Sequence, residues 1–250
     1  MAARKNAPPK DATNSNTFEP AREGRRATER GDETRDRILE AALKLFRKRG
    51  FDRATVRDVA RAAGVAPSAA YYYYPSKDAL VLAWYARVQR EHDVRAAAAA
   101  SLPDLRERLR ATFRAKLDIV AEDRALLGGV FRYVGEAQHP LSPLGPHTRA
   151  LREQSVATFA RALGDHPLPA DLASAVPTLL WTLHLGFLLL LVYDDSPGLA
   201  RTYRLADDAA NLVCTALGLT SLPPVSAVLA PVWGALRDAG LLPGVRARRV

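Results

Sequence analysis

The residues of this chain whose types and spacing could do chemistry lie between Thr55 and Lys77. Thr55 supplies a hydroxyl beside the free N–H groups of a predicted helix start, and together these suit an anion. Arg57 supplies a guanidinium that can form paired hydrogen bonds, and Lys77 supplies a compact positive charge. These groups are suited to binding an anionic partner and do not form a catalytic pair.

Patterns typical of catalysis and metal binding do not occur in the sequence. The single cysteine, Cys214, excludes an intramolecular disulfide and any zinc site built on a cysteine pair. There is no Gly-rich phosphate loop, and Ser142, Ser155 and Ser174 lie in no nucleophile-elbow context. Histidines that lack metal-ligand spacing and partner carboxylates are His92, His139, His147 and His166. We therefore expect no enzyme, no cofactor and no metal site.

Composition predicts an all-α protein of one or two domains. The 250 residues include 45 Ala, 35 Leu and 30 Arg, which favour helices, whereas β-branched residues are sparse. Residues 1–77 hold 17 Lys/Arg against 10 Asp/Glu, and residues 78–250 hold 19 against 17, so most of the net charge of +9 lies in the first third. This indicates an anionic partner, nucleic acid before a membrane surface, although a solvated basic surface explains the charge alone equally well.

The hydrophobic pattern predicts helices separated by Pro and Gly. We expect a disordered tail over 1–31 without a signal peptide, order from Asp32 with Thr34 as a helix cap, and a loop over 138–146. Helices are predicted near 34–49, 55–64, 67–74, 76–98, 103–121, 123–135, 147–163, 170–193 and 198–217, with a further one around 225–236. The longest apolar run, Leu179–Tyr193, has 15 residues, too few for a membrane span. We therefore expect a buried helix and a cytoplasmic protein that does not associate with membranes.

The segment from Thr55 to Pro75 has the pattern of two short helices joined by a tight turn. Thr55-Val-Arg-Asp58 predicts a capping box, Gly64 permits the turn, and Pro67 can start the second helix. Apolar residues at inward-facing spacings are Val59, Ala63, Val65 and Ala70. With the amphipathic helix before it, this segment indicates a helix-turn-helix.

Residues 32–92 resemble the DNA-binding domain of the TetR family of bacterial transcriptional regulators. The resemblance rests on Thr34-Arg-Asp-Arg-Ile-Leu-Glu-Ala-Ala, Leu45-Phe46, Gly50-Phe51, Thr55-Val-Arg-Asp-Val-Ala, Ala63-Gly-Val and, most specifically, Tyr74-Pro-Ser-Lys-Asp-Ala-Leu80. It implies an N-terminal three-helix DNA-binding domain over 32–92, a helical dimerisation and ligand domain over 93–218, and an extension over 219–250. The implied function is a homodimeric, ligand-responsive repressor on a palindromic operator. The alternative is a DNA-binding protein of the same fold that acts without a small-molecule inducer.

The resemblance also implies which side chains meet double-stranded DNA. These are Thr55, Arg57, Pro67, Ser68, Ala69, Tyr71, Tyr72, Tyr73 and Lys77. The family pattern assigns Thr55, Tyr73 and Lys77 to phosphate and Arg57 to a base edge. Because helix 67–74 has no Arg, Lys, Asn or Gln, readout there depends on Ser and Tyr hydroxyls and on apolar contact with thymine.

The sequence departs from the family in two places. Ala66 stands where a Ser or Thr cap is usual, which forfeits roughly 1 kcal/mol of capping. The run Tyr71–Tyr74 is unusually aromatic. We expect Tyr74 to pack in the core, Tyr73 to face DNA, and Tyr71 to do both.

By the same resemblance the C-terminal domain holds a pocket for a small ligand. Candidate lining residues are Phe113, Phe131, Tyr133, Phe159, Trp181 and His184. Since charges are not clustered there, we expect an apolar or aromatic effector. The same residues could instead fill a solid core, with His184 as a hydrogen-bonded core histidine.

Dimerisation is expected through the last two helices. Copies of 170–193 and 198–217 are predicted to form a four-helix bundle across a two-fold axis. The predicted contact stripe is Ala206, Ala210, Val213 and Leu217.

Overall fold

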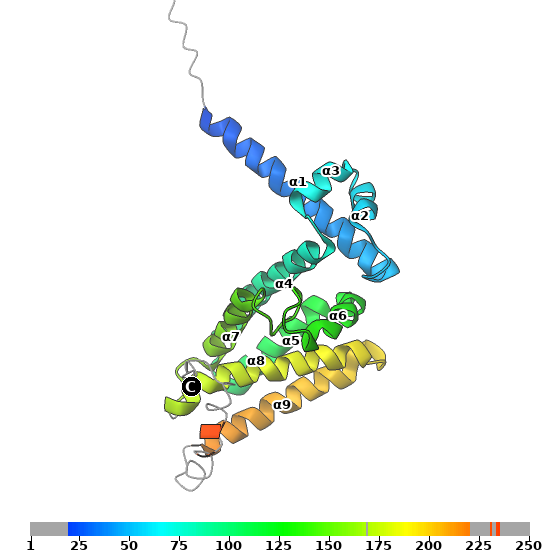
Figure 1. The fold of residues 1–250 in the computed structure, drawn as a ribbon. Coiled ribbons are helices and arrows are strands. Elements are labelled where there is room, and N and C mark those ends of the chain that lie inside the picture. Colours follow the sequence, from blue (N-terminus) through cyan, green and yellow to red (C-terminus); the bar gives the residue numbers. More distant parts are fainter. Residues whose placement is uncertain (1–19, 169, 221–230, 232–233, 236–250) are drawn as a thin grey trace, which may run out of the picture. The chain divides into compact units, whose positions relative to one another are not determined.

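The computed structural model describes residues 20–168, 170–220, 231 and 234–235, and all regular structure in these ranges is helical (Figure 1). The all-α prediction is therefore confirmed. The chain forms two compact units, residues 1–37 and residues 38–250. The second unit contains every candidate site residue.

Helix α1 spans Pro20–Arg49 and begins earlier than predicted. The expected start near Asp32 is wrong, and Thr34 is not a cap, because its hydroxyl donates to the Arg30 carbonyl at 2.9 Å inside the helix. The physical reason lies in the segment that begins at Pro20, since proline suits a first turn and the alanines, arginines and glutamates that follow favour helix. The disorder expected for residues 1–19 lies outside the described residues.

The two short helices of the helix-turn-helix are α2 (Val56–Ala63) and α3 (Pro67–Tyr73). The predicted capping box is confirmed: the Asp58 amide donates to Thr55 Oγ1, and the Thr55 amide donates to Asp58 Oδ2, each at 3.1 Å. Gly64 follows α2 with φ 66°, a left-handed conformation that glycine adopts without steric cost. Ala66 is the N-cap residue of α3 and makes no side-chain hydrogen bond to the helix, because its methyl side chain has no acceptor.

The next helix, α4 (Lys77–Ala100), starts at the Ser76 cap. It packs against α5 (Leu105–Val120) and α7 (Arg149–Leu163). Next, α6 (Arg124–Phe131) lies against α8 (Ala170–Tyr193), and α9 (Ala200–Leu219) lies against α5. Single 3₁₀ turns are η1 (Ala121–Asp123), η2 (Arg132–Gly135) and η3 (Pro197–Leu199). The predicted helices of this region are confirmed to within a few residues, as is the loop over 138–146.

Helix α8 has the predicted bounds, but its apolar segment is longer than the 15-residue run found in the sequence. Pro177 lies inside it, so the apolar segment Leu172–Tyr193 has 22 residues and is long and apolar enough to cross a membrane, a property that core helices share. The length argument against a membrane span is therefore wrong. Burial within the protein supports a core helix instead, because Leu180, Phe187 and Leu191 are enclosed by other helices.

The predicted contact stripe on α9 is wrong. Ala206 and Ala210 are fully buried and Leu217 nearly so within one protomer, because small alanines let α9 lie close to α5. The exposed apolar stripe consists instead of Leu205, Leu212 and Leu219, spaced seven residues apart. The helix expected around 225–236 lies outside the described residues, apart from three helical positions at 231 and 234–235.

Candidate nucleic-acid interface and internal cavity

The outer face of α3 presents small and aromatic side chains to solvent. Pro67 and Ser68 are exposed, and Tyr71 and Tyr72 are 43% and 82% exposed. Ala69 is half-buried, as the inner edge of such a face would be. Apolar tyrosine surface that stays in water does not gain the free energy of burial. This face is therefore suited to contact with a partner that would cover it.

The tyrosine run divides between core and surface. Tyr74 is 2% exposed in the core, as predicted. Tyr73 was expected to face DNA, but its ring is half-buried against the core and lies edge-on to Tyr72, with centroids 5.1 Å apart. The physical reason is the helical period, which turns Tyr73 toward the side of Ala70 while Tyr72 points outward. Tyr73 therefore supports the domain and offers at most its hydroxyl edge to a partner.

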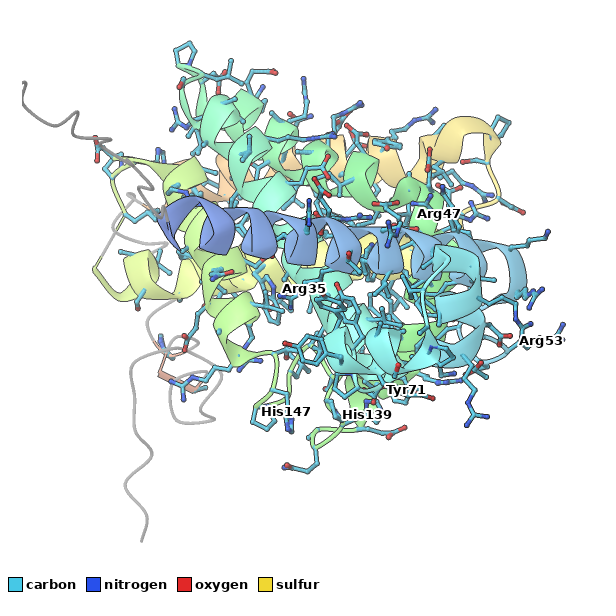
Figure 2. The ribbon with its side chains drawn as sticks, turned by 90° about the horizontal axis from the view of Figure 1, so that it is seen from above. Arg35, Arg47, Arg53, Tyr71, His139 and His147 are labelled. Atoms are coloured by element: carbon cyan, nitrogen blue, oxygen red, sulfur yellow. The ribbon has the colours of Figure 1, made fainter. Side chains whose placement is uncertain are left out.

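Cations border this face on α2 and on the turn before it. Arg57 and Arg53 are exposed and form no ion pair with any described residue, and Figure 2 shows Arg53 extending into solvent. Arg61 lies only 3.9 Å from Asp58. Sequence reasoning missed Arg53, although a basic residue between two helices that flank a binding face is itself a signal. Thr55 is less available than expected, because its hydroxyl donates to Asp58 Oδ2 at 2.6 Å, and these bonds lower the pKa of Asp58.

Lys77 has a structural role that the sequence did not reveal. Its Nζ donates to the carbonyls of Phe51 and Asp52 at 3.0 and 3.2 Å and lies 4.5 Å from the centroid of the Phe51 ring. Two of its three donors are therefore occupied. Lys77 ties the first turn of α4 to the turn between α1 and α2, and one donor is left for phosphate.

Two polar links join the end of α1 and the turn after it, which precede the helix-turn-helix, to the rest of the unit. Asp123 is buried and accepts hydrogen bonds from Arg47 Nε at 2.6 Å and from Trp84 Nε1 at 2.9 Å. On the surface, Arg132 forms a two-pronged ion pair with Asp52, with N–O distances of 2.9 and 2.5 Å. Neither link was predicted, since each joins residues about 40 to 80 positions apart.

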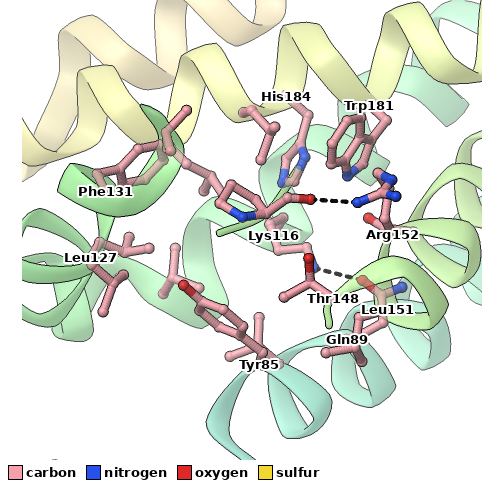
Figure 3. Close-up of a pocket in the computed structure, with 18 of the residues that line it drawn as sticks. Tyr85, Gln89, Lys116, Leu127, Phe131, Thr148, Leu151, Arg152, Trp181 and His184 are labelled. Atoms are coloured by element: carbon pink, nitrogen blue, oxygen red, sulfur yellow. Dashed lines mark hydrogen bonds between the residues drawn. The ribbon is translucent and has the colours of Figure 1, made fainter. Parts of the chain in front are cut away.

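A cavity opens among α4, α5, α6, α7 and α8 (Figure 3). Its empty volume is about 750 Å³ when the open solvent at its mouth is counted. Of the six predicted lining residues, Phe131, Trp181 and His184 do line it. Phe113 and Phe159 are fully buried and fill the core, with ring centroids 5.5 Å apart.

Tyr133 also lies outside this lining. Its ring stacks on His139, with centroids 3.6 Å apart, and its hydroxyl accepts a hydrogen bond from Arg132 at 2.8 Å. The family resemblance indicated which helices surround a pocket, but it cannot tell which of their aromatic side chains leave space between them.

Lys116 is the unexpected member of the cavity wall. It is 5% exposed, and its Nζ donates to Gln89 Oε1 at 3.1 Å. Burial lowers the pKa of Lys116 to about 7, although the nearby Asp93 carboxylate opposes the shift. A signal was present, because Lys116 falls on the apolar stripe of α5 with Leu109, Phe113 and Val120.

Two histidines lie beside this lysine. The rings of His92 and His184 are nearly parallel, with centroids 6.1 Å apart. Burial lowers the pKa of His92 to about 3 and that of His184 well below its usual value, so both are neutral at physiological pH. His92 Nε2 lies 3.0 Å from the Thr112 carbonyl, whereas neither ring nitrogen of His184 has a partner in good hydrogen-bond geometry. The alternative of a satisfied core histidine therefore fits His92 better than His184.

Comparison with known proteins shows similarity in sequence for the N-terminal part of the chain. Residues 38–84 match the family model described as bacterial regulatory proteins, tetR family. The chain is 42% identical over 77 residues to the HTH-type transcriptional regulator TtgR of Pseudomonas putida, a match that covers 31% of this chain and 37% of TtgR. The curated relatives are thus matched over well under half of their own length.

Solved structures extend the likeness, in fold, to about 70% of this chain. The fatty acid degradation regulator FadR of Bacillus halodurans superposes with a TM-score of 0.54 at 18% identity, over 70% of this chain and 96% of that chain. FadR of Thermus thermophilus, in complex with lauroyl-CoA, superposes with a TM-score of 0.52 at 24% identity, over 70% and 92% of the two chains.

Proposed function

Since the chain belongs, through its helix-turn-helix domain, to the TetR family of bacterial regulatory proteins, we propose that it is a DNA-binding transcriptional regulator of the bacterial cytoplasm. The observation that supports this most directly is the exposed face of α3, which includes Tyr72, together with the exposed Arg53 and Arg57, which form no ion pair with any described residue. Unpaired cations next to exposed hydroxyl-bearing side chains suit phosphate and base edges together. Residues 32–92 would form the DNA-binding domain.

The regulator would act as a homodimer on a palindromic operator. Helix α9 exposes Leu205, Leu212 and Leu219, and α8 exposes Leu190 and Tyr193, which share a surface hollow with Leu205. This apolar surface would pack against its copy across a two-fold axis, so that residues 93–218 serve dimerisation and regulation. Two DNA-binding domains held in this way would meet half-sites roughly 10 bp apart or slightly more.

The cavity would receive a small effector and make the protein a ligand-responsive repressor. One support is that Trp84, in the cavity wall, shares Asp123 with Arg47 near the end of α1. Another is the similar fold of T. thermophilus FadR, a TetR-family repressor whose structure was solved in complex with lauroyl-CoA. A repressor that uses no inducer is the second candidate, favoured by the core positions of Phe113 and Phe159.

Selection from a random duplex library tests DNA binding. The full chain is incubated with 30-bp random duplexes, and bound sequences are compared with those bound by an Arg57→Ala/Tyr72→Ala variant. We expect the unaltered chain to enrich a palindrome and the double variant to lose the enrichment while remaining helical. Equal enrichment by both proteins, or none by either, would contradict the proposed interface.

A further inference from the structure

Three buried polar side chains in the cavity wall have hydrogen-bonding capacity that the described residues do not fill. Lys116, Ser155 and His184 come from α5, α7 and α8 and are 5%, 4% and 3% exposed. Ser155 Oγ and both ring nitrogens of His184 lack partners in good geometry, and Lys116 Nζ has one partner, Gln89, for three donors. Buried polar groups in native proteins are normally paired, so the unpartnered Ser155 and His184, together with the unused donors of Lys116 in the same cavity, point to a missing partner.

No carboxylate of the described chain pairs with this lysine. The Asp93 carboxylate attracts the Lys116 charge electrostatically. It already forms an ion pair with Arg161 at 2.7 Å and accepts a hydrogen bond from Gln89 at 3.1 Å. Arg152, the other cation of the wall, donates its NH1 to the carbonyls of Pro143 and Gly145. A buried ammonium without a counter-ion is costly, and an anion that enters the cavity would remove that cost.

Apart from Tyr85, Gln89, Thr148 and Arg152, the rest of the wall is apolar. Figure 3 shows Lys116 next to His184 at one part of the cavity and Leu127 and Phe131 at another. Apolar residues from the other helices are Trp84, Val88, Val130 and Leu188. These apolar residues favour an aromatic or aliphatic hydrocarbon body, and a second ligand charge buried against them would be unpaired.

We propose that the cavity binds an organic monocarboxylate, with its head group on Lys116, Ser155 and His184 and its hydrocarbon body against the apolar wall. The inference rests on the proposed function in taking this cavity as the effector site. It also changes the expectation of an uncharged apolar effector, because the sequence did not reveal a cation inside the cavity.

Matched acid and amide pairs test the charge of the head group. Calorimetric titration of the full chain without DNA uses 1-naphthaleneacetate, 4-phenylbutanoate and decanoate, each against its amide. We expect the acid of at least one pair to bind about tenfold tighter than its amide, the size of one charge-assisted hydrogen bond. Lys116→Met should reduce that preference to about twofold, since a single ammonium supplies it. The control Lys44→Met, at an exposed position, should leave it unchanged.

A second variant separates head-group binding from folding. Ser155→Ala removes a hydroxyl without changing charge and should weaken the acid by a few-fold, with little effect on the amide. Equal binding of acids and amides, an unchanged preference in Lys116→Met, or no binding by any acid would overturn the proposal. Because these titrations contain no DNA, they can fail while operator selection succeeds, and the reverse.

Discussion

Trp84 Nε1 donates a 2.9 Å hydrogen bond to Asp123 Oδ2, and this bond connects the cavity wall to a buried carboxylate. The other oxygen of Asp123 accepts from Arg47 Nε at 2.6 Å, near the end of α1. A ligand that shifts the Trp84 indole therefore acts on a group that also holds the helix-turn-helix. The carboxylate is shared, so the two contacts depend on one another.

Asp123→Asn should weaken this connection. The amide presents an NH₂ group to one of two donors, so we expect a loss of about 1–3 kcal/mol in the free energy of unfolding. Urea unfolding measures it. The matched control is Glu122→Gln, whose carboxylate lies 3.4 Å from Arg47 but is 82% exposed, and we expect no measurable change there. Equal effects in the two variants would contradict the role of the buried carboxylate.

Lys77→Ala should lower stability as well as DNA affinity. The substitution removes two hydrogen bonds to the Phe51 and Asp52 carbonyls, so we expect unfolding to become easier by about 1 kcal/mol. Thermal unfolding of Lys77→Ala measures this loss of stability. The control is Lys48→Ala, at an exposed position on α1. The salt dependence of duplex binding then shows whether the third donor meets phosphate, since loss of one phosphate contact makes that dependence shallower.

Arg57→Ala should change specificity at one base pair in each half-site. A guanidinium that binds guanine with two hydrogen bonds contributes about 1–3 kcal/mol of discrimination. Base-substitution scanning of the selected operator measures it. Arg61→Ala is the comparison, and it should weaken all operators alike. If Arg57→Ala keeps the same base preferences, Arg57 does not read sequence.

Leu212→Asp should give monomers. Leu212 is 70% exposed in the middle of the apolar stripe on α9, and a charge buried there against a second copy would be unpaired. Light scattering on a sizing column measures the mass. Leu144→Asp, at an exposed position in a loop, should stay dimeric. A dimeric Leu212→Asp would move the interface to another surface.

Lys116 should make stability rise with pH. Burial lowers its pKa from 10.5 to about 7, so between these values the unfolded chain binds more protons than the folded one. Over this window stability should rise by up to roughly 1.4 kcal/mol per pH unit relative to Lys116→Met. His92 and His184, which face Lys116 from α4 and α8, are neutral throughout the window. The Asp93 carboxylate also acts on Lys116 and opposes the shift in its pKa. Urea unfolding of both proteins from pH 7 to 10 measures it, and a constant difference would contradict it.

Local signals made the helix-turn-helix predictable. The Thr55–Asp58 capping box and the left-handed Gly64 depend on residues within a few positions of each other. The faces of α9 were not predictable in this way. Two apolar stripes run along it, and helical periodicity alone does not show that the alanine stripe packs against α5 while the leucine stripe faces solvent.

The cavity was predictable only in part for a related reason. Inward-facing aromatic residues can be identified from spacing, but empty space depends on how five helices pack together. Trp181 borders the space, whereas Phe159 fills the core beside it.

The Arg132–Asp52 ion pair and the buried Asp123 link differ in their response to ionic strength. The two partners of the surface pair are 45% and 64% exposed, so dissolved salt screens their attraction, whereas the Asp123 side chain is 3% exposed and is largely shielded from ions. Concentrated salt should therefore loosen the outer attachment of the helix-turn-helix and leave the inner one intact. Ionic strength and effector binding would then act on the same DNA-binding domain through separate attachments.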